Sequence, residues 1–340
     1  MANRPMTSIH SRVGWLRIGA SKAAIFLFLL VLPNVRAFAW GCAGHQTVAL
    51  VALSQLNPRA SAKVHELLQG QPLPAIHRFC GATTLDVFAD VATWADDERG
   101  IRKETAGWHF LDIPLGASRD SLATFCDPAV GCVTQAINTQ LGVLRSGKGT
   151  HQDQANALMF VVHFLGDLHQ PLHDTTNNDR GANCIPVAFF GQEPKLTDAS
   201  GEGYTPNLHG VWDTDLPMRI GNIRDASRDN DVTQFAAQLS SEFATDIKTW
   251  QREPVDLDQW AWDSHQLAVS AAYGKLPTPV PVEKPQVVNT CSDDNNVGKR
   301  MKQLNEDLGA QYLALVTPAI KRQLAKAGTR LAMILNQLWP

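Results

Sequence analysis

One segment of this chain, residues 155–168 (ANALMFVVHFLGDL), constrains the fold more than any other. It is apolar on almost every side of the helix that its length and composition predict, and such a helix belongs in the middle of a protein. The segment nevertheless carries His163 and Asp167, whose spacing of four residues places both side chains on one face. The sequence therefore predicts a central helix with two polar side chains facing the core.

Two arrangements could satisfy this pair, because an uncompensated polar or charged group in the interior is very unfavourable. The imidazole of His163 could form a hydrogen bond with the carboxylate of Asp167, or both could bind a divalent metal ion. His209 and Asp213 repeat the same spacing on another predicted helix. The spacing alone does not choose between the two arrangements.

Helical periodicity continues through most of the chain. Strand-forming sequence is confined to residues 185–190 (IPVAFF), which could form half of a hairpin in the polar stretch 174–207, and a second long loop covers 276–298. Since strands and helices do not alternate, an α/β sheet is not expected. We predict a single all-α domain with long loops and at most a small β-hairpin. The expected helices span residues 45–56, 59–68, 85–98, 129–145, 155–168, 208–216, 232–251 and 259–273, with two more inside 301–338.

The first 39 residues have the three parts of a secretory signal peptide. A basic stretch precedes ten apolar residues, 23–32, and Ala37-Phe38-Ala39 forms a cleavage site with small residues at both ends. The alternative is a membrane anchor, but a spanning helix needs about 20 apolar residues. We therefore expect residues 1–39 to be removed. Residues 40–340 would form the working domain, which is secreted or periplasmic and has no stable membrane anchor.

Loss of the leader would remove five basic residues and change the formal net charge from −3 to −8. If such an acidic chain binds nucleic acid, the positive charge must be concentrated locally. All six cysteines lie after residue 39, and an even number behind a signal peptide favours disulfides. Cys126 and Cys132 bracket a short loop, so we predict a disulfide between them.

Several further histidines and aspartates accompany the central pair. His45 follows closely after the predicted cleavage point, Asp96 and His109 lie on either side of a short loop, and His173 comes just after the central helix. Imidazole and carboxylate ligands without thiolates favour zinc over magnesium or calcium. Several metal ions close together would suit hydrolysis of a phosphoester, because two ions can activate water and stabilise the leaving oxygen.

Five motifs in this order make the chain resemble a known family. It is similar to the S1/P1 nuclease family, secreted nucleases with three zinc ions that prefer single strands and share an all-α fold with the zinc phospholipases C. The matching motifs are Trp40-Gly-x-x-Gly-His45, Trp94-Ala-Asp96 with Arg99, His109-Phe-Leu-Asp112, His163-Phe-Leu-Gly-Asp167-x-His-Gln-Pro-Leu-His173 and Asn207-Leu-His209-x-Val-Trp-Asp213.

The resemblance implies three zinc ions, two of which form a pair bridged by Asp167. The pattern also assigns the α-amine and the carbonyl of Trp40 to one ion of the pair. The implied ligands of the three ions are Asp96, His109, His163 and Asp167 for the first, Trp40, His45 and Asp167 for the second, and His173, His209 and Asp213 for the third.

The resemblance also implies how the reaction proceeds. A hydroxide held between the paired zinc ions would attack phosphorus, the third ion would stabilise the leaving 3′ oxygen, and the product would carry a 5′ phosphate. Arg99 would stabilise charge on the phosphoryl group, although it could instead be a solvated arginine at a helix end. Phe110 would stack on an unpaired base and Asp112 would hydrogen-bond to it; the alternatives are a core phenylalanine and a helix-capping aspartate.

Some residues depart from the family pattern or have no role in it. Cys42 lies inside the first motif, where a disulfide to Cys80 or Cys184 is expected rather than a bond to metal. Ala182 stands where the family usually has a second glycine. We expect His169 to support the ligands from outside the metal site. The remaining histidines should be surface or core residues: His65, His77, His151 and His265.

The expected substrates are single-stranded DNA or RNA and 3′-nucleotides, and no protein partner is inferred. One alternative is a phospholipase C that uses the same zinc ions on a lipid phosphodiester. Another is a secreted protein that binds zinc or lipid without catalysis. The presence of Arg99 beside a full set of ligands favours an enzyme, and Phe110 with Asp112 favours a nucleobase over a lipid head group.

Overall fold

The structure of the chain is a computed structural model that describes residues 40–71, 80–81, 83–196, 204–224, 228–288, 290–291 and 307–340. The predicted signal peptide, residues 1–39, and His77 lie outside these ranges. The described part consists of helices, turns and loops with one pair of very short strands, so the all-α prediction is confirmed. None of the described helices is both long and apolar enough to span a bilayer.

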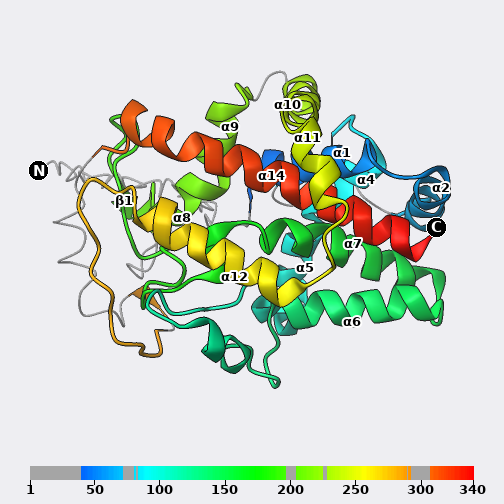
Figure 1. The fold of residues 1–340 in the computed structure, drawn as a ribbon, viewed down its shortest axis with the longest axis horizontal. Coiled ribbons are helices and arrows are strands. Elements are labelled where there is room, and N and C mark those ends of the chain that lie inside the picture. The colour runs from blue at the N-terminus through cyan, green and yellow to red at the C-terminus, as the bar shows by residue number, and fades with distance from the viewer. Residues whose placement is uncertain are drawn as a thin grey trace, which may run out of the picture. The chain divides into compact units, whose positions relative to one another are not determined.

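The predicted central helix is α7 (His151–Asp167), which contacts α1, α2, α5, α6 and α14 and lies among them in Figure 1. Thr150 and Asp153 form a reciprocal capping box at its N-terminus, which satisfies main-chain groups that the first turn leaves free. Every residue from Ala157 to Asp167 is buried. The apolar sequence therefore places His163 and Asp167 in the core.

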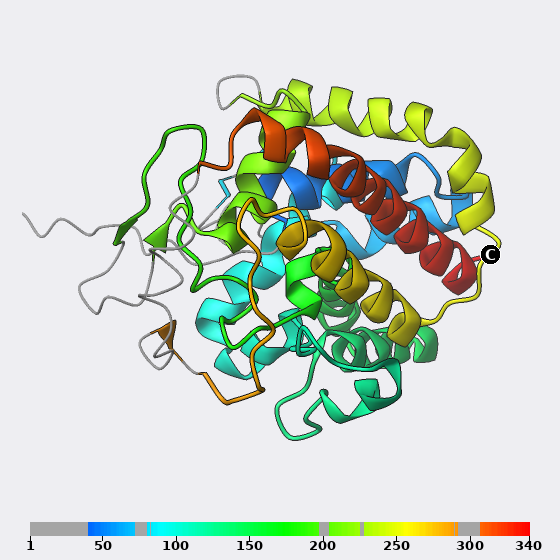
Figure 2. The ribbon, with the colours of Figure 1, turned by 60° about the vertical axis from the view of Figure 1, so that its left-hand side comes forward.

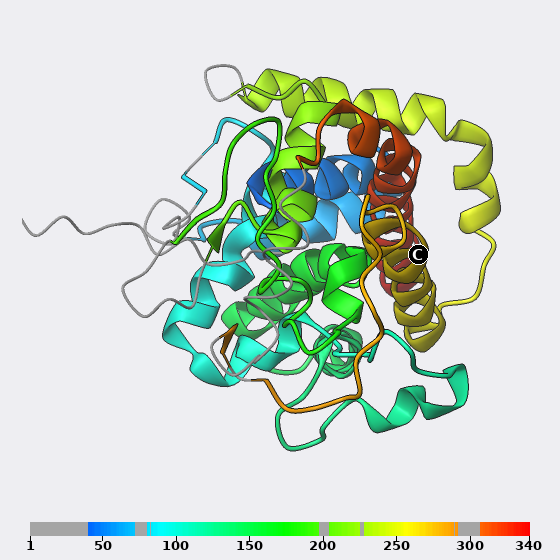
Figure 3. The ribbon, with the colours of Figure 1, turned by 90° about the vertical axis from the view of Figure 1, so that its left-hand side faces the viewer.

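Two helices from opposite ends of the chain cover one side of this core. They are α1 (Cys42–Leu53) and α14 (Ala310–Leu338). A Cβ atom on Gly328 would lie 2.6 Å from the Cβ of Val51, so only glycine lets the two helices approach this closely. Figure 2 and Figure 3 show α14 running between α10 (Arg228–Glu242) and α12 (Leu257–Leu267).

Within the described part of 301–338, residues 307–338, the structure has one helix instead of the two that the sequence predicts for the whole range. α14 is a single helix of 29 residues that continues through Pro318. Proline removes one main-chain hydrogen bond and is unfavourable inside a helix. Here the buried residues from Tyr312 to Leu335 keep one face of the helix against the core on both sides of Pro318. Tertiary packing therefore maintains a helix that the local sequence would interrupt.

Four other predicted helices are correctly placed but divided. The region 85–98 begins as α4 and passes through a 3₁₀ turn before α5, and 232–251 is divided between α10 and α11. The regions 208–216 and 259–273 contain π-helical turns. The remaining bounds are α2 Pro58–Leu68, α4 Val87–Asp90, η1 Val91–Thr93, α5 Trp94–Ile101, η2 Lys103–His109, η3 Arg119–Thr124, α6 Val133–Ser146, η4 Pro171–Asp174, α8 Leu208–Gly210, η5 Val211–Asp215, α9 Leu216–Ile220, α11 Ala244–Trp250 and η7 Ala268–Tyr273.

The strands lie close to the predicted ones but not at the same residues. β1 (Lys195–Leu196) pairs antiparallel with β2 (Tyr204–Thr205). The segment 185–190, which we predicted as a strand, forms only isolated bridges at Pro186, Ala188 and Phe189. Ile185, Val187, Ala188 and Phe189 are buried in the core instead of pairing along a ladder, whereas Phe190 is exposed.

Three disulfides join the six cysteines: Cys42–Cys80, Cys126–Cys132 and Cys184–Cys291. The predicted Cys126–Cys132 pair is confirmed. Of the two partners left open for Cys42, the structure has Cys80. No thiol remains for a metal ion, since all six sulfurs are oxidised.

Candidate metal centre

Eight of the histidines and aspartates of the five motifs come together in three groups that could each hold a metal ion. Within each group the ligand atoms lie within 4.8 Å of one another, and every residue is buried. Two groups share His163 and together form what we call the helical cluster, while the third forms the turn cluster. The helical cluster comprises His45, Asp96, His109, His163 and Asp167; the turn cluster comprises His173, His209 and Asp213.

Asp167 is the centre of the helical cluster. One carboxylate oxygen lies 3.3 Å from Nε2 of His45, and the other lies 3.0 Å from Nδ1 of His109 and 3.3 Å from Nε2 of His163. Asp96 completes the cluster, with one oxygen 3.7 Å from the same nitrogen of His109. Since the two oxygens of Asp167 face different imidazoles, this carboxylate has the position of a bridge between two ions.

Helix packing sets these positions. His163 and Asp167 lie one turn apart on α7, His45 projects from α1, and the rings of His45 and His163 stack with centroids 4.0 Å apart. A Cβ atom on residue 166 would lie only 2.6 Å from Nδ1 of His45, so Gly166 leaves the space that this ring occupies. The close approach of α1 to α7 thus depends on a glycine between the two polar residues of the central helix.

Main-chain carbonyls fix the orientation of three imidazoles. Nδ1 of His163 donates to Ala92 at 2.8 Å, and Nδ1 of His173 donates to the carbonyl of His109 at 2.8 Å. Nδ1 of His209 donates to the carbonyl of Gly181. Each bond leaves Nε2 as the lone-pair nitrogen directed into the centre, which is the usual arrangement for a metal-binding histidine.

Burial and neighbouring charges shift the pKa values of the helical cluster in different directions. Burial lowers the pKa of His109 to about 3 and that of His45 to about 4. Burial also opposes the charged form of His163, but Asp167 and Asp96 outweigh it and raise the pKa of His163 to about 9. Burial raises the pKa of Asp96 to about 7. A divalent cation requires neutral imidazoles and ionised carboxylates. Binding of a metal ion would therefore release the protons that His163 and Asp96 hold in its absence.

Several buried polar atoms in the two clusters lack a hydrogen-bond partner among the described residues. They include both ring nitrogens of His45, Nε2 of His173 and one oxygen each of Asp96, Asp167 and Asp213. Leaving such atoms unsatisfied in the interior costs about 1–3 kcal/mol each. Their lone pairs converge on the same spaces, so metal ions fit this set of donors and would satisfy it. A simple His–Asp hydrogen bond satisfies only part of it.

The turn cluster is assembled from short elements. His173 lies in η4, His209 in α8 and Asp213 in η5, and Nε2 of His209 is 3.0 Å from a carboxylate oxygen of Asp213. The side-chain amide of Gln170 donates to the other carboxylate oxygen. Gln170 also accepts the main-chain N–H of Leu172 at 2.6 Å, which holds it at the start of η4.

Gly181 is required beside the turn cluster for two reasons. Its φ is +61°, and a Cβ atom would lie 2.5 Å from the carbonyl oxygen of Leu172. The next residue, Ala182, also has a positive φ of +67°, which is unfavourable for an L-residue with a side chain. The position where the family usually has glycine is therefore a left-handed position in this chain.

Sequence reasoning did not assign roles to Gly166, Gly181 or Gln170, although all three lie within the motifs or beside them. The glycines could have been suspected from their position next to ligands. Gln170 could also have been suspected, because it lies between the ligand candidates Asp167 and His173 in the sequence. The carbonyl of Ala92 gave no signal in the sequence, because every residue has a carbonyl and only the fold decides where it lies.

Phe110 and Asp112 lie on an extended segment between the two clusters. His109, Leu111 and Ile113 are buried in alternation with them, whereas Phe110 is 37% exposed. Successive side chains of an extended chain point to opposite sides, so Phe110 and Asp112 face the same way. Neighbouring protein groups partly exclude water from the Asp112 carboxylate, and this desolvation, together with the negative charge of Asp179, raises the pKa of Asp112 to about 6. The residue as a whole is still exposed to solvent.

Arg99 lies at the edge of the helical cluster. Its guanidinium is 3.7 Å from the Asp96 carboxylate, one turn earlier on α5, and 17% of its side chain is exposed. A cation in this position is close to the metal-binding atoms and still reaches solvent. Trp40 is fully buried immediately before α1, and its carbonyl accepts the N–H of His45 at 3.1 Å.

The other histidines lie outside the metal-binding groups. His169 is buried behind α7, where its Nε2 accepts a hydrogen bond from Arg330 at 3.0 Å. His265 is buried against Thr175, while His65 and His151 lie at the surface and contact Asp86 and the carbonyl of Glu66. The positions of His65, His151 and His265 agree with the sequence expectation. His169 also lies outside the metal-binding groups, but its two ring nitrogens bond to Arg330 and to the carbonyl of Leu165, so support of the ligands by His169 stays a prediction.

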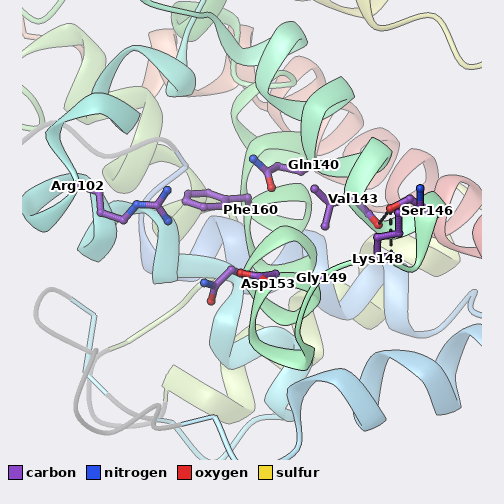
Figure 4. A pocket seen from close by; sticks show the side chains of 9 residues that line it. Arg102, Gln140, Val143, Ser146, Lys148, Gly149, Asp153 and Phe160 are labelled. Atoms are coloured by element: carbon purple, nitrogen blue, oxygen red, sulfur yellow. Dashed lines mark hydrogen bonds between the residues drawn. The ribbon is translucent and has the colours of Figure 1, made fainter.

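A surface hollow of about 400 Å³ lies between α6, α7 and the end of α5. In Figure 4 the guanidinium of Arg102 faces the ring of Phe160, 5.5 Å from its centroid, while Lys148 lies at the opposite end. None of the residues that line it belongs to the helical or the turn cluster. The hollow is therefore separate from the candidate metal centre.

Comparisons with known proteins agree with this geometry. The chain is 28% identical to Nuclease P1 of Penicillium citrinum over 88% of its length and 97% of that protein. It is 27% identical to Nuclease S1 of Aspergillus oryzae, over 88% and 91% of the two chains, and 26% identical to Endonuclease 3 of Arabidopsis thaliana, over 92% and 93%. The model of the S1/P1 Nuclease family matches residues 40–340. The chain therefore belongs to the S1/P1 nuclease family.

Proposed function

We propose that this protein is a zinc-dependent nuclease that hydrolyses phosphodiester bonds of single-stranded DNA or RNA and releases 5′-phosphate products. One observation carries the proposal: buried histidines and aspartates from five separate motifs converge with unsatisfied lone pairs directed at one another. The names of the related proteins, which are nucleases and endonucleases, support the same chemistry.

Three zinc ions fit the ligands. The helical cluster would hold two of them, bridged by Asp167, and the main-chain amine and carbonyl of Trp40 would complete the second. The turn cluster would hold the third. When bound, zinc would supply a Lewis acid for the phosphoryl group and lower the pKa of a water molecule.

Groups of the protein would orient both the metal ligands and the phosphoryl group of the substrate. The carbonyls of Ala92, His109 and Gly181 keep the imidazoles directed inward. Arg99, beside Asp96 and partly exposed, is placed to donate to an oxygen of the phosphoryl group. A fixed cation there needs little reorganisation when negative charge increases in the transition state.

The same site would favour unpaired bases. Phe110 offers an exposed ring and Asp112 a carboxylate on the same side of one extended segment, between the metal clusters. A base can stack on Phe110 only if it has left a duplex. Since a single nucleotide could use these contacts as well, we include 3′-nucleotides among the proposed substrates.

A panel of substrates tests this function. Protein that begins at Trp40 and is loaded with zinc would be given single-stranded and duplex DNA of one sequence, RNA, 3′-AMP and phosphatidylcholine, with and without chelator. We expect single strands to be cleaved much faster than duplex, and chelator to abolish the activity. Hydrolysis of phosphatidylcholine alone would favour the phospholipase C alternative, and hydrolysis of none would favour a binding protein.

We further propose that residues 1–39 direct export and that residues 40–340 are the mature domain, secreted or periplasmic. The family match begins at Trp40, which is also the residue after the predicted cleavage site. Three disulfides within residues 40–340 suit an oxidising compartment. Sequencing the N-terminus of the exported protein tests the proposal, and any start other than Trp40 contradicts it.

A further inference from the structure

We infer that Phe190 and Arg219 form a second binding position for single-stranded nucleic acid, which accepts a nucleotide that flanks the cleaved bond. The guanidinium of Arg219 lies 3.6 Å from the centroid of the Phe190 ring. Both residues are exposed, Phe190 by 36%. The inference rests on the proposed nuclease function, because that function identifies the ligand class, but it concerns residues outside the metal centre.

The pair offers two kinds of contact on one small surface. The guanidinium of Arg219 covers one face of the Phe190 ring, and Phe189 packs nearly perpendicular to it at a centroid distance of 4.9 Å. A base would stack on the part of the ring that stays exposed, 36% of the residue. Arg219 offers a cation for a phosphate, and within the described ranges no carboxylate lies within 4.0 Å of its nitrogens. Asp215, one turn earlier on the chain, interacts with it electrostatically. Proteins that bind single strands combine such aromatic and cationic groups.

The main chain holds Phe190 in an unfavourable conformation. Its φ is +48°, in the left-handed region, where a bulky side chain is a genuine outlier. Glycine or asparagine would adopt this conformation more easily. Such outliers persist where the surroundings impose them and often mark functional positions. An exposed aromatic ring at this position is therefore not explained by the requirements of the turn.

The turn itself is firmly attached to the start of α14. Asp307 accepts the N–H of Gly191 at 2.9 Å, and the N–H of Leu308 donates to the carbonyl of Ala188 at 2.8 Å. Within the turn, Phe189 and Gln192 exchange two main-chain bonds. The ring of Phe190 is thus presented by a braced loop, which limits the entropy lost when a base binds.

Both residues are connected to the turn cluster by short stretches of chain. α9, which carries Arg219, continues directly from η5, which carries Asp213. The loop that carries Phe190 is bonded to the region of His209, because the N–H of Leu208 donates to the carbonyl of Ile185 at 2.8 Å. Figure 1 and Figure 3 show α8 and α9 as consecutive turns, with the loop before β1 close to them. A strand bound at the metals could extend to this pair.

The test compares a long and a short substrate. Zinc-loaded protein that begins at Trp40 would hydrolyse the thymidine dinucleotide and the octanucleotide, and the ratio of their kcat/KM values would be measured. The variants are Phe190→Asn, which suits a left-handed backbone, Phe190→Tyr, which keeps the ring, Arg219→Ala and Arg219→Lys. Arg322→Ala is the matched control, since Arg322 also faces an aromatic ring, Trp250, at 5.0 Å, but on α14 and α11.

We expect Phe190→Asn to lower the octanucleotide-to-dinucleotide ratio by about 5- to 20-fold, the lower part of the range for loss of one base–aromatic stack. Phe190→Tyr should keep the ratio of the parent protein. Arg219→Ala should lower the ratio as well and reduce the slope of log(kcat/KM) against log salt for the octanucleotide by about 0.7, because one phosphate contact is lost. Arg219→Lys should retain the slope, and Arg322→Ala should change neither quantity.

An unchanged ratio in Phe190→Asn and Arg219→Ala would overturn the inference, as would an equal loss in Arg322→Ala. If Phe190→Asn does not fold, as judged by circular dichroism, the salt slope of Arg219→Ala decides. Failure of the parent protein to cleave either substrate would instead overturn the nuclease function, and the inference with it.

Discussion

The helical cluster and the turn cluster contain the same residue types, histidine and aspartate, but are built differently. The five residues of the helical cluster are held mainly by packed helices, with Gly166 allowing α1 and α7 to approach. Its polar groups contact mainly one another, with Asp167 touching three imidazoles. The turn cluster lies on η4, α8 and η5, and depends on individual hydrogen bonds from Gln170 and Gly181.

This difference predicts different weaknesses. A site held by helix packing is rigid because many apolar contacts would have to change together. A site held by a few hydrogen bonds responds to the loss of any one of them. We therefore expect the helical cluster to fail when its shared carboxylate or its N-terminal ligand is altered, and the turn cluster to weaken when its supporting groups are altered.

The largest effect should follow from Asp167→Ala. Because Asp167 contacts His45, His109 and His163, its loss should release more than one of three zinc ions and abolish activity. Asp213→Ala should release only the ion of the turn cluster. Elemental analysis after dialysis against zinc gives the metal content of both variants. Loss of a single ion from each would contradict the bridging role.

The N-terminus should affect the helical cluster alone. A chain that begins at Ala39 turns the α-amine of Trp40 into an amide nitrogen, which is a poor metal ligand, whereas a free α-amine has a pKa of about 7.7–8.0 and can lose its proton to zinc. We expect this chain to fold but to lose more than about 100-fold in activity, since loss of outer-shell partners already costs about 10–100-fold.

The control for this prediction is the chain that begins at Trp40, with both N-termini verified by mass spectrometry. The alternative role of Trp40 is an aromatic plug, because its side chain is fully buried before α1. A plug would tolerate one extra residue. Full activity of the longer chain would therefore remove Trp40 from the ligands, and zinc analysis would show whether the turn cluster keeps its ion.

A smaller effect should come from Gln170→Leu, which removes the amide that holds the Asp213 carboxylate. We expect the affinity for the third zinc ion to fall about 10–100-fold, as for other outer-shell partners, with the paired ions retained. Competition with a chelator of known affinity measures this loss. Gln323→Leu is the control, since Gln323 is also buried but bonds to the carbonyl of His169. Equal losses in both variants would mean that the effect is general.

The sequence predicted the helical cluster better than its surroundings. The four-residue spacing of His163 and Asp167 on an apolar helix needs only local geometry, and the motifs brought the remaining ligands to the same site. Whether each ligand binds zinc stays a prediction. Local sequence could not show that α14 continues through Pro318, because packing with distant helices decides it. Nor could it show the left-handed Phe190, since loop conformation depends on contacts such as that with Asp307.

The smallest expected effect concerns the backbone of the turn cluster. Ala182 has a φ of +67° and follows the glycine whose carbonyl orients His209. A left-handed conformation costs a residue with a side chain about 1–2 kcal/mol, and Ala182→Gly would remove that cost. The change also gives up burial of one methyl group, worth about 0.8 kcal/mol, and makes the unfolded chain more flexible, which costs about 0.4–1 kcal/mol. Relative to the same change at a position with negative φ, which has these two costs without the relief, Ala182→Gly should therefore gain about 1–2 kcal/mol in the free energy of unfolding.

Urea unfolding at a fixed zinc concentration measures the gain, because bound metal itself adds stability that depends on its concentration. Ala188→Gly is the matched control, since Ala188 is equally buried but is not among the residues with positive φ. It should lose about 1.2–1.8 kcal/mol, from the methyl group and from the greater freedom of the unfolded chain. If Ala182→Gly loses as much as the control, the left-handed position carries no strain, and the turn cluster would then be no more strained than the helical one.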